Sequence, residues 1–294
     1  MILPTMKNYA RNGLFAVALA MALAHGAMNM NASDADLAAL KLVASRRPLV
    51  IGHRGYCQVA PENTLPSFKL AMSAGADLVE LDYHHTKDGK LIVIHDGELD
   101  HTTDATNRWQ EKKIKVETKT AAEIQSLDAG SWFDSRFAGE TLPTLKEVLM
   151  LAGEKILINI EIKSSAWESG FPEDAIERQV VNLIIQHDLL SSTLVSSFHA
   201  GFLENIVGLP VHPEVAFITD RKVPQNTLDI CKQLRVFSWH PHYKSLEQRH
   251  IEEAHAQGIL IFPYTVNLVE DMRKLVSMGV DGIITDDPYP DLLP

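Results

Sequence analysis

Charged side chains follow several apolar runs of this sequence directly. His53 and Arg54 follow PLVIG, His95 follows KLIVI, and Lys163 follows ILINIEI. A histidine titrates near neutral pH, so one such residue can accept a proton from a nucleophile and another can donate one to a leaving group. Arginine and lysine bind oxygen anions such as phosphate. These residue types therefore indicate acid/base chemistry on an anionic substrate.

Three carboxylates occur within the same apolar runs. Glu80 and Asp82 are two residues apart in a predicted strand, so their side chains share one face, and Glu161 is flanked by isoleucines. Buried carboxylates repel one another unless a cation compensates them. One reading is an oxygen-rich site for a divalent metal ion, Ca²⁺ or Mg²⁺. The other is ordinary buried ion pairs of Glu80 and Glu161 with Arg54 and Lys163.

Other signals of chemistry are weak or missing. The chain contains 13 histidines, several of them in apparently ordinary positions, such as His240 and His242. His53 and His95 differ because each ends an apolar strand beside another charged residue. The sequence has no P-loop, GxSxG or HExxH motif, so the hydrolase and NTPase classes with those motifs lack their signatures.

Alternating strands and helices must position these residues. Strands are predicted at 48–55, 77–85, 90–96, 156–163, 192–198, 214–219, 235–240, 259–266 and 281–287. Helices are predicted between them, among others at 65–74, 144–152, 173–187, 245–257 and 268–278. About eight such units predict an α/β fold, a TIM (β/α)8 barrel, whose active site lies at the carboxyl ends of the strands.

Two segments depart from that repeat. Residues 86–89 form a link too short for a parallel crossover, so we expect a hairpin there and one strand outside the regular barrel. Residues 97–143 are polar and show little strand pattern. We interpret them as a small insertion after the third strand, within a barrel domain of residues 48–294, that covers one side of the active-site mouth.

Composition limits the class of partner. The formal net charge is −11 and the sequence has no basic run, which argues against a nucleic-acid partner. An anionic small-molecule substrate remains compatible with this charge if a metal and a few cations meet at one point. The sequence leaves the oligomeric state open.

The first residues resemble an export signal. Lys7 and Arg11 precede the apolar run 13–24, and small residues follow it. That run is shorter than a stable membrane span of about 20 residues. We expect a signal peptide over residues 1–27 and a periplasmic or secreted protein; an uncleaved anchor or an amphipathic helix is the alternative. The two cysteines, Cys57 and Cys231, are expected to be free thiols, although export permits a disulfide.

Ordered motifs extend over most of the chain and resemble the glycerophosphodiester phosphodiesterase family. They are HRG (53–55), PENT (61–64), VELD (79–82), TKDG (86–89), IHD (94–96), DAGSWF (128–133), LPTLKEVL (142–149), NIEIK (159–163), SSF (196–198), YTVN (264–267) and DGIITDDP (281–288). Each block alone is weak. Their consistent order from about residue 48 to about residue 290 makes the resemblance specific.

The resemblance implies a role for each candidate residue. Members of the family are TIM barrels that hydrolyse glycerophosphodiesters to glycerol 3-phosphate and an alcohol. Glu80, Asp82 and Glu161 match the divalent-metal ligands, His53 the proton acceptor, His95 the proton donor, and Arg54 and Lys163 the phosphate-contacting cations. The nucleophile, water or a glycerol hydroxyl, is left open.

Two departures from the family pattern concern the alcohol pocket. Residues 56–58 (Tyr-Cys-Gln) replace the small residues that often follow HRG, and Tyr264 stands where many members have tryptophan.

The sequence also leaves two alternatives to an enzyme for small glycerophosphodiesters. One is a lysophospholipase D-like enzyme for larger lipids, with the aromatic residues of the insertion facing a lipid chain. The other is a non-catalytic binding protein, which would not need a general acid.

Overall fold

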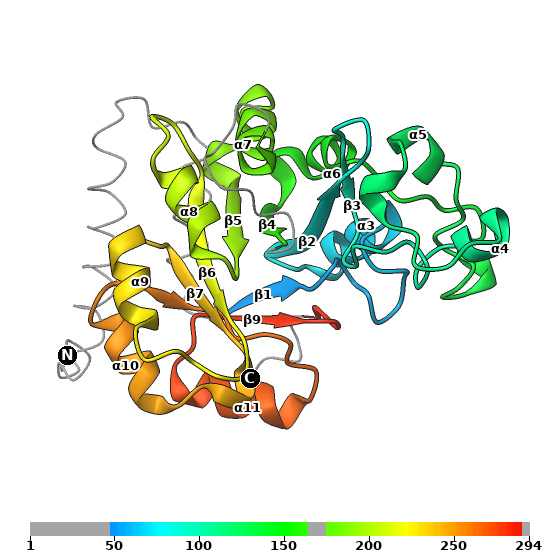
Figure 1. Ribbon diagram of the computed structural model, residues 1–294. Coiled ribbons are helices and arrows are strands. Elements are labelled where there is room, and N and C mark those ends of the chain that lie inside the picture. The colour runs from blue at the N-terminus through cyan, green and yellow to red at the C-terminus, as the bar shows by residue number, and fades with distance from the viewer. Residues whose placement is uncertain (1–47, 164–174, 290–294) are drawn as a thin grey trace, which may run out of the picture.

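Eight parallel strands form the barrel of this protein (Figure 1). The computed structural model describes residues 48–163 and 175–289. The strands lie side by side in the order β8-β7-β6-β5-β4-β2-β1-β9. Their bounds are β1 (Leu49–Gly52), β2 (Leu78–His85), β4 (Leu157–Ile162), β5 (Thr193–Ser197), β6 (Glu214–Thr219), β7 (Ser238–Pro241), β8 (Leu260–Ile261) and β9 (Gly282–Thr285). The predicted TIM barrel is confirmed.

Backbone hydrogen bonds connect the two ends of this strand order. The Asp281 N–H donates to the Ile261 carbonyl at 3.1 Å, and the Ile284 N–H donates to the Pro263 carbonyl at 3.0 Å. The Val266 N–H donates to the Ile284 carbonyl at 2.9 Å. The chain that continues from β8 therefore lies against β9, so the carboxyl ends of all eight strands surround one mouth.

The ninth strand, β3 (Leu91–Val93), lies outside the barrel, as the short link predicted. It pairs antiparallel with β2, with Tyr83 opposite Val93. The turn is closed by the Thr86 N–H, which donates to the Lys90 carbonyl at 2.8 Å. Gly89 adopts φ of 70° there, a conformation that glycine reaches without strain. The hairpin thus brings the chain back along β2 toward the mouth.

Helices cover the outside of the barrel, and short ones also lie in the insertion at residues 97–143 (Figure 1). They are α3 (Leu65–Ala74), α4 (Ala105–Trp109), α5 (Ala121–Ile124), α6 (Leu145–Ala152), α7 (Ile176–Gln186), α8 (Ala200–Val207), α9 (Thr227–Leu234), α10 (Gln248–His255) and α11 (Val269–Met278). Short 3-10 helices occur at Val116–Thr118, Ser135–Phe137, Gly153–Lys155, Leu190–Ser192 and Tyr243–Ser245. The five helices predicted by range are confirmed within a few residues; positions 173–174 of one lie outside the described residues.

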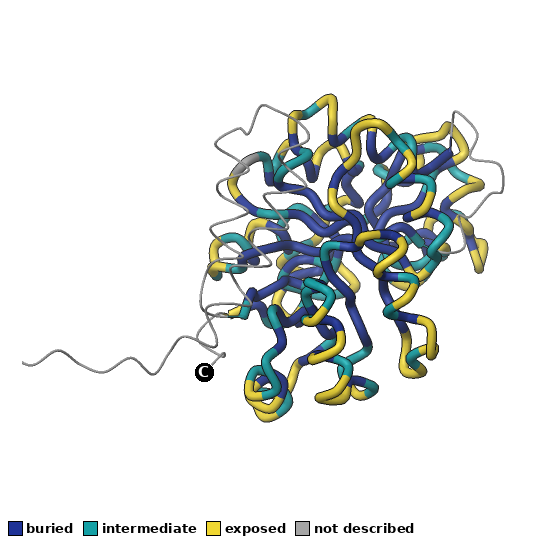
Figure 2. The backbone as a smooth tube through the Cα atoms, turned by 90° about the vertical axis from the view of Figure 1, so that its left-hand side faces the viewer, coloured by how far each residue is buried: buried dark blue, intermediate teal, exposed yellow. Residues whose placement is uncertain are grey.

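The two faces of the strands have different surroundings. Leu81 and Tyr83 of β2 belong to the large core between the strands and the helices, whereas Leu78 belongs to a smaller core inside the barrel. Since side chains alternate along a strand, Glu80 and Asp82 share the inward face with Leu78. The strands are buried along most of their length, and the exposed residues lie in the surrounding helices and loops (Figure 2).

The insertion after the third strand, residues 97–143, contains α4 and α5 and has a core of its own. Leu99, Ile114 and Leu127 lie in that core, and Trp109 packs against it. The insertion projects from one side of the barrel beside the β2–β3 hairpin (Figure 1). Capping boxes start its helix α5 and the following helix α6. The insertion therefore folds around an apolar cluster that also includes Ile92 and Ile94 of the hairpin.

Three sequence predictions concern the remaining features. The proposed signal segment, residues 1–27, lies outside the described residues. Within the part of the chain that the structure describes, none of the helices is both long and apolar enough to cross a membrane. Cys57 and Cys231 are free thiols, one partly buried and the other buried.

Candidate active site

A tight turn after β1 places His53 and Arg54 at the mouth. Arg54 and Gly55 adopt φ of 53° and 86°. A Cβ on Gly55 would lie 2.3 Å from Ser67 Oγ and 2.7 Å from the Ser67 carbonyl carbon, so only glycine fits between the turn and α3. Ser67 Oγ in turn donates to the Arg54 carbonyl at 2.8 Å. The glycine of HRG thus fixes the turn against the first helix.

The PENT segment locks this turn onto β2. Glu62 accepts a hydrogen bond from Arg54 Nη1 at 2.9 Å. The side chain of Asn63 is buried and donates to Asp82 Oδ2 at 3.0 Å, while the Asp82 N–H donates to Asn63 Oδ1 at 3.3 Å. Thr64 caps α3. The motif was matched in the sequence without a role, and its role here is to hold Arg54 and Asp82 in place.

The three predicted metal ligands come together. Oxygens of Glu80, Asp82 and Glu161 all lie within 4.8 Å of one another. Register explains this, since Asp82 of β2 stands opposite Glu161 of β4. A small pocket opens beside them. It is lined by His53, Glu80, Asn159, Glu161, Ile218, His240, Tyr264 and Ile284.

Both predicted cations lie among these carboxylates. Lys163 Nζ is 2.7 Å from Asp82 Oδ1 and 2.7 Å from Glu161 Oε1. Arg54 Nε lies 3.5 Å from Asp82 Oδ2, and the Arg54 backbone N–H donates to Glu80 Oε2 at 2.8 Å. Burial alone would lower the pKa of both cations, but the surrounding carboxylates outweigh it and raise the pKa of each. Both therefore stay charged.

The carboxylates differ in the charge they can carry. Burial, and then the neighbouring Asp82 and Glu161, raise the pKa of Glu80 well above its usual range. Burial also raises the pKa of Glu161, against the opposing effect of Lys163. Burial would raise the pKa of Asp82 as well, yet Lys163 and Arg54 lower it overall. Without another cation, Glu80 and Glu161 therefore resist ionisation, whereas Asp82 stays charged.

Two uncompensated oxygens indicate that the cluster fits a cation. Among the described residues, Glu80 Oε1 and Asn159 Oδ1 are buried side-chain atoms that make no hydrogen bond. Buried oxygens without a partner are costly. Both residues line the pocket, and carboxylate and amide oxygens are the ligands of Mg²⁺ and Ca²⁺. These oxygen ligands thus suit a hard divalent ion. Lys163 alone leaves Glu80 Oε1 and Asn159 Oδ1 without a hydrogen-bond partner.

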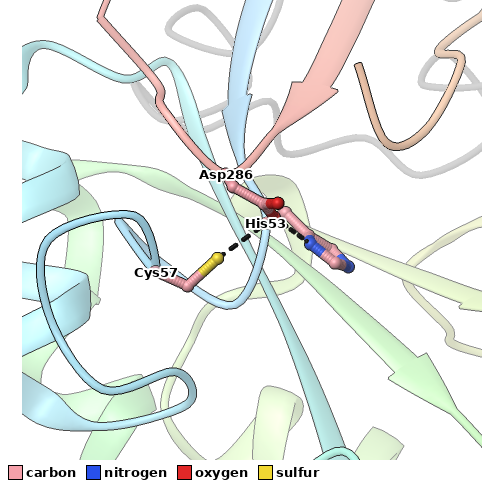
Figure 3. Close-up of side chains that lie close together, drawn as sticks. All are labelled: His53, Cys57 and Asp286. Carbon is pink, nitrogen blue, oxygen red and sulfur yellow. Dashed lines mark hydrogen bonds and ion pairs between the residues drawn. The ribbon is translucent and has the colours of Figure 1, made fainter. Parts of the chain in front are cut away.

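His53 is held by an aspartate that sequence reasoning did not single out. Its Nδ1 lies 2.6 Å from Asp286 Oδ1 (Figure 3). Burial opposes ionisation of Asp286, but the hydrogen bonds from His53, Cys57 and Asn267 lower its pKa to about 2. An ionised carboxylate only accepts hydrogen bonds, so Nδ1 of His53 is the donor and Nε2 is left able to accept a proton.

His95 has a similar partner in the next residue. Its Nδ1 lies 2.8 Å from Asp96 Oδ1, and His101 Nδ1 lies 2.7 Å from the other oxygen of the same carboxylate. The pKa of His95 is lowered, mainly by burial, although the Asp82 carboxylate opposes this shift. His84 Nε2 lies 3.1 Å from the His95 carbonyl, which ties His95 to the end of β2. Asp96 and His101 also line a larger hollow between the barrel and the insertion.

Aromatic side chains gather at the ends of β5, β7 and β8. Phe198 and His242 both meet Tyr264 edge to face, with ring centroids 6.1 Å and 5.7 Å from it. Tyr264 itself lines the pocket. His240, an ordinary residue by sequence, also faces the pocket, and burial lowers its pKa to about 3, so it is neutral at physiological pH. One side of the mouth is therefore aromatic and uncharged.

Comparison with known proteins decides the family. The model of the glycerophosphoryl diester phosphodiesterase family matches residues 53–289, which span the barrel and its insertion. The chain belongs to this family. A relative from Caldanaerobacter subterraneus, named glycerophosphodiester phosphodiesterase, is 38% identical over 82% of this chain and 95% of the relative. A relative of the same name from Bacillus subtilis is 35% identical over 85% of this chain and 87% of the relative.

Solved structures of phosphodiesterases have the same architecture. A putative glycerophosphoryl diester phosphodiesterase from Silicibacter pomeroyi superposes with a TM-score of 0.75 at 26% identity, over 85% of this chain and 94% of the other. A phosphodiesterase from Oleispira antarctica, solved with the product sn-glycerol-3-phosphate, superposes with a TM-score of 0.73 at 29% identity. The match covers 84% of this chain and 96% of the other. In this glycerophosphodiester phosphodiesterase family member, all seven predicted site residues lie at the same end of the barrel.

Proposed function

We propose that this protein hydrolyses glycerophosphodiesters to glycerol 3-phosphate and an alcohol. One observation supports the proposal most directly. Two histidines, His53 and His95, each contact an aspartate, and both lie at the barrel mouth that holds the three carboxylates and two cations. Family membership supports the same activity. The Oleispira phosphodiesterase was solved with the product sn-glycerol-3-phosphate, which agrees with the glycerol side of the reaction.

The phosphate is the group that this cluster would bind. A divalent cation, Mg²⁺ or Ca²⁺, held by Glu80, Asp82 and Glu161, would supply positive charge that stabilises the phosphoryl oxygens in the transition state. Arg54 provides fixed charge and a planar donor group for the same oxygens. Glu62 and Asp82 contact the guanidinium, so Arg54 is oriented before substrate arrives.

His53 is suited to the role of general base. Asp286 holds Nδ1–H, so Nε2 of the neutral ring carries the lone pair that can accept a proton from the nucleophile. The same carboxylate stabilises the imidazolium that this transfer creates. The nucleophile is either water or a neighbouring glycerol hydroxyl, in which case a cyclic phosphate would form first.

His95 is suited to the role of general acid. Asp96 holds its Nδ1, so a proton on Nε2 can pass to the oxygen of the leaving alcohol. His95 sits on the hairpin, away from β1, so the acid and the base come from different segments of the mouth. Burial lowers the pKa of His95 overall, and the charge of Asp82 opposes this shift.

The aromatic side of the mouth is the place we assign to the alcohol. Tyr264 reaches from the end of β8 into the pocket, and its hydroxyl donates to the Thr219 carbonyl at 3.1 Å. Phe198 and His242 support its ring. A ring face attracts a cationic headgroup such as choline or ethanolamine. We therefore favour glycerophosphodiesters of amino alcohols as substrates.

The lipid alternative receives little support from the insertion. Trp109 packs against the local core of the insertion, and Trp132 is 43% exposed. Phe133 meets Trp132 and Phe137 edge to face. None of these four residues lines the pocket beside the carboxylates. A short glycerophosphodiester accordingly suits the site better than a lysophospholipid.

A coupled assay for released glycerol 3-phosphate tests the proposed function. The wild-type chain should hydrolyse glycerophosphocholine, and a His95→Ala variant should lose this turnover while its circular dichroism stays unchanged. Lysophosphatidylcholine, whose hydrolysis releases choline and lysophosphatidate and is therefore followed by the choline, should be turned over more slowly. Wild-type protein that binds glycerophosphocholine but releases nothing would indicate the binding-protein alternative, and faster turnover of lysophosphatidylcholine would indicate the lysophospholipase alternative.

Export to the periplasm or beyond the cell is a further part of the proposal. It rests on the composition of residues 1–27. Expression of the full chain in a Gram-negative host followed by osmotic shock should release a protein shortened by about this segment. Full-length protein in the cytoplasmic fraction would contradict export.

A further inference from the structure

A second group of possible metal ligands surrounds the proposed general base. Nδ1 of His53, Sγ of Cys57 and an oxygen of Asp286 lie within 4.8 Å of one another. The thiol donates to Asp286 Oδ1 at 3.1 Å, and His53 Nδ1 lies 2.6 Å from the same oxygen. His53 and Cys57 come from the segment between β1 and α3, Asp286 follows β9, and the three side chains point toward one another (Figure 3).

The chemistry of this group differs from that of the acidic cluster. Glu80, Asp82 and Glu161 offer oxygen alone, which suits Mg²⁺ or Ca²⁺. His53, Cys57 and Asp286 offer nitrogen, sulfur and oxygen, and a thiolate selects softer ions such as Zn²⁺. Three protein ligands leave one position of a tetrahedral ion open, as in zinc sites that keep a solvent molecule.

The surroundings hold the ligands in place. Asn267 Nδ2 donates to Asp286 Oδ2 at 2.6 Å, and the Asp286 N–H donates to Asn267 Oδ1 at 3.0 Å. Such outer contacts fix the direction of a ligating carboxylate. The side chains of His53 and Asp286 are 19% and 26% exposed, so an ion can reach them from the mouth.

We propose that His53, Cys57 and Asp286 form a second metal site that binds a thiophilic divalent cation of the Zn²⁺ class and thereby inhibits the enzyme. On binding, the Cys57 thiol gives its proton to solvent, and the proton on Nδ1 of His53 is replaced by one that Nε2 takes up from solvent. The sulfur, Nδ1 and the carboxylate then each bond to the ion, and Nε2 is no longer free to accept a proton. The His53–Asp286 contact is then lost, because both atoms face the ion. The inhibition rests on the proposed role of His53 as the base, whereas the binding does not.

Cobalt absorption tests the binding part on the full chain. Co²⁺ bound by a thiolate gives a sulfur-to-metal charge-transfer band in the near ultraviolet. Wild-type protein titrated with Co²⁺ should show this band, Cys57→Ser should lack it, and Cys231→Ser should keep it. Absence of the band from wild type, or its persistence in Cys57→Ser, would refute the site.

Zinc inhibition tests the other part. In the presence of saturating Mg²⁺ or Ca²⁺, Zn²⁺ should inhibit wild type and Cys231→Ser to the same extent. The Zn²⁺ concentration that halves the rate of Cys57→Ser should be at least about tenfold higher than the concentration that halves the wild-type rate. Equal sensitivity of Cys57→Ser and wild type would place the inhibition at the acidic cluster and overturn the proposal. Wild type that shows the cobalt band but no hydrolysis at all would refute the proposed function and leave the binding site standing.

Discussion

The Asp286 carboxylate lies 2.6 Å from Nδ1 of His53, and this contact joins the end of the last strand to the end of the first. The two residues are 233 positions apart in the sequence. The contact sets which ring nitrogen of His53 carries the proton and where the ring points. It makes Asp286 a positioning residue for the proposed base.

Replacement of Asp286 by asparagine should therefore lower kcat by about 100-fold to about 10,000-fold, with little change in KM. The amide can present its NH₂ group to Nδ1 and favour the wrong tautomer. Steady-state kinetics of Asp286→Asn beside Glu270→Gln, an exposed change on α11, measures this. A KM effect of the same size as the kcat effect would contradict a positioning role.

A His95→Ala variant should show a loss that depends on the leaving group. Turnover of glycerophosphocholine should fall by about 100-fold to about 10,000-fold, because the alkoxide leaves without a proton. A p-nitrophenyl ester of glycerol phosphate needs no acid, so its hydrolysis should fall far less. His212→Ala, an exposed change before β6, should leave both rates unaltered. Equal losses on both substrates would show that His95 is not the acid.

Removal of divalent ions should abolish turnover and also change stability. Saturating Mg²⁺ or Ca²⁺ should raise the melting temperature of the chelated wild type by about 5 °C or more. Glu80→Gln should show no such rise. Without metal it should melt at or above the wild-type temperature, since burial and the carboxylates around Glu80 disfavour its charged form. Differential scanning fluorimetry gives both values. An equal metal-induced rise in Glu80→Gln would contradict this ligand assignment.

Tyr264 should influence the choice of alcohol. Tyr264→Ala should reduce kcat/KM for glycerophosphocholine about 2-fold to about 30-fold more than for glycerophosphoglycerol, because the ring face no longer meets a cation. Tyr264→Phe keeps the ring and loses only the hydrogen bond to the Thr219 carbonyl, so it should keep the preference. A uniform effect of Tyr264→Ala on both substrates would place the alcohol elsewhere.

The His255–Asp281 pair should contribute stability at low pH only. Nε2 of His255 lies 2.7 Å from Asp281 Oδ2, and this hydrogen bond raises the pKa of His255 above its usual value near 6.5. The contribution is thus complete below that value and is lost as the pH rises through the raised pKa. Urea unfolding of wild type and His255→Gln should differ more at about pH 5 than at about pH 9. A constant difference would mean that the charged pair has no net effect.

Much of the barrel was predictable because its local patterns are strong. The strands are apolar runs on both faces, and the polar residues after them mark the carboxyl ends. The short link 86–89 predicted the hairpin on length alone. His53, Glu80, Asp82, His95 and Glu161 were found because each interrupts or ends an apolar strand. A site at one end of a parallel barrel follows from those positions.

The contacts made by Asp286 and Asn63 could not be read from local patterns. The contact of Asp286 with His53 depends on how the barrel closes, although TDDP at the end of β9 was a visible motif. Asn63 reaches Asp82 only because the turn at Arg54 and Gly55 folds back on α3. Helices α4 and α5 were missed, since each is four or five residues long and is stabilised by the core of the insertion.

The β2–β3 hairpin has a consequence for how such enzymes can diversify. His53 belongs to the closed ring of parallel strands, whereas His95 follows a strand outside that ring, where the insertion begins. Mutations that reshape the insertion can therefore shift the donor relative to the leaving group while the acceptor and the carboxylate cluster stay fixed. Directed evolution for new alcohols should accordingly accumulate its changes around His95 and the insertion before it alters the barrel.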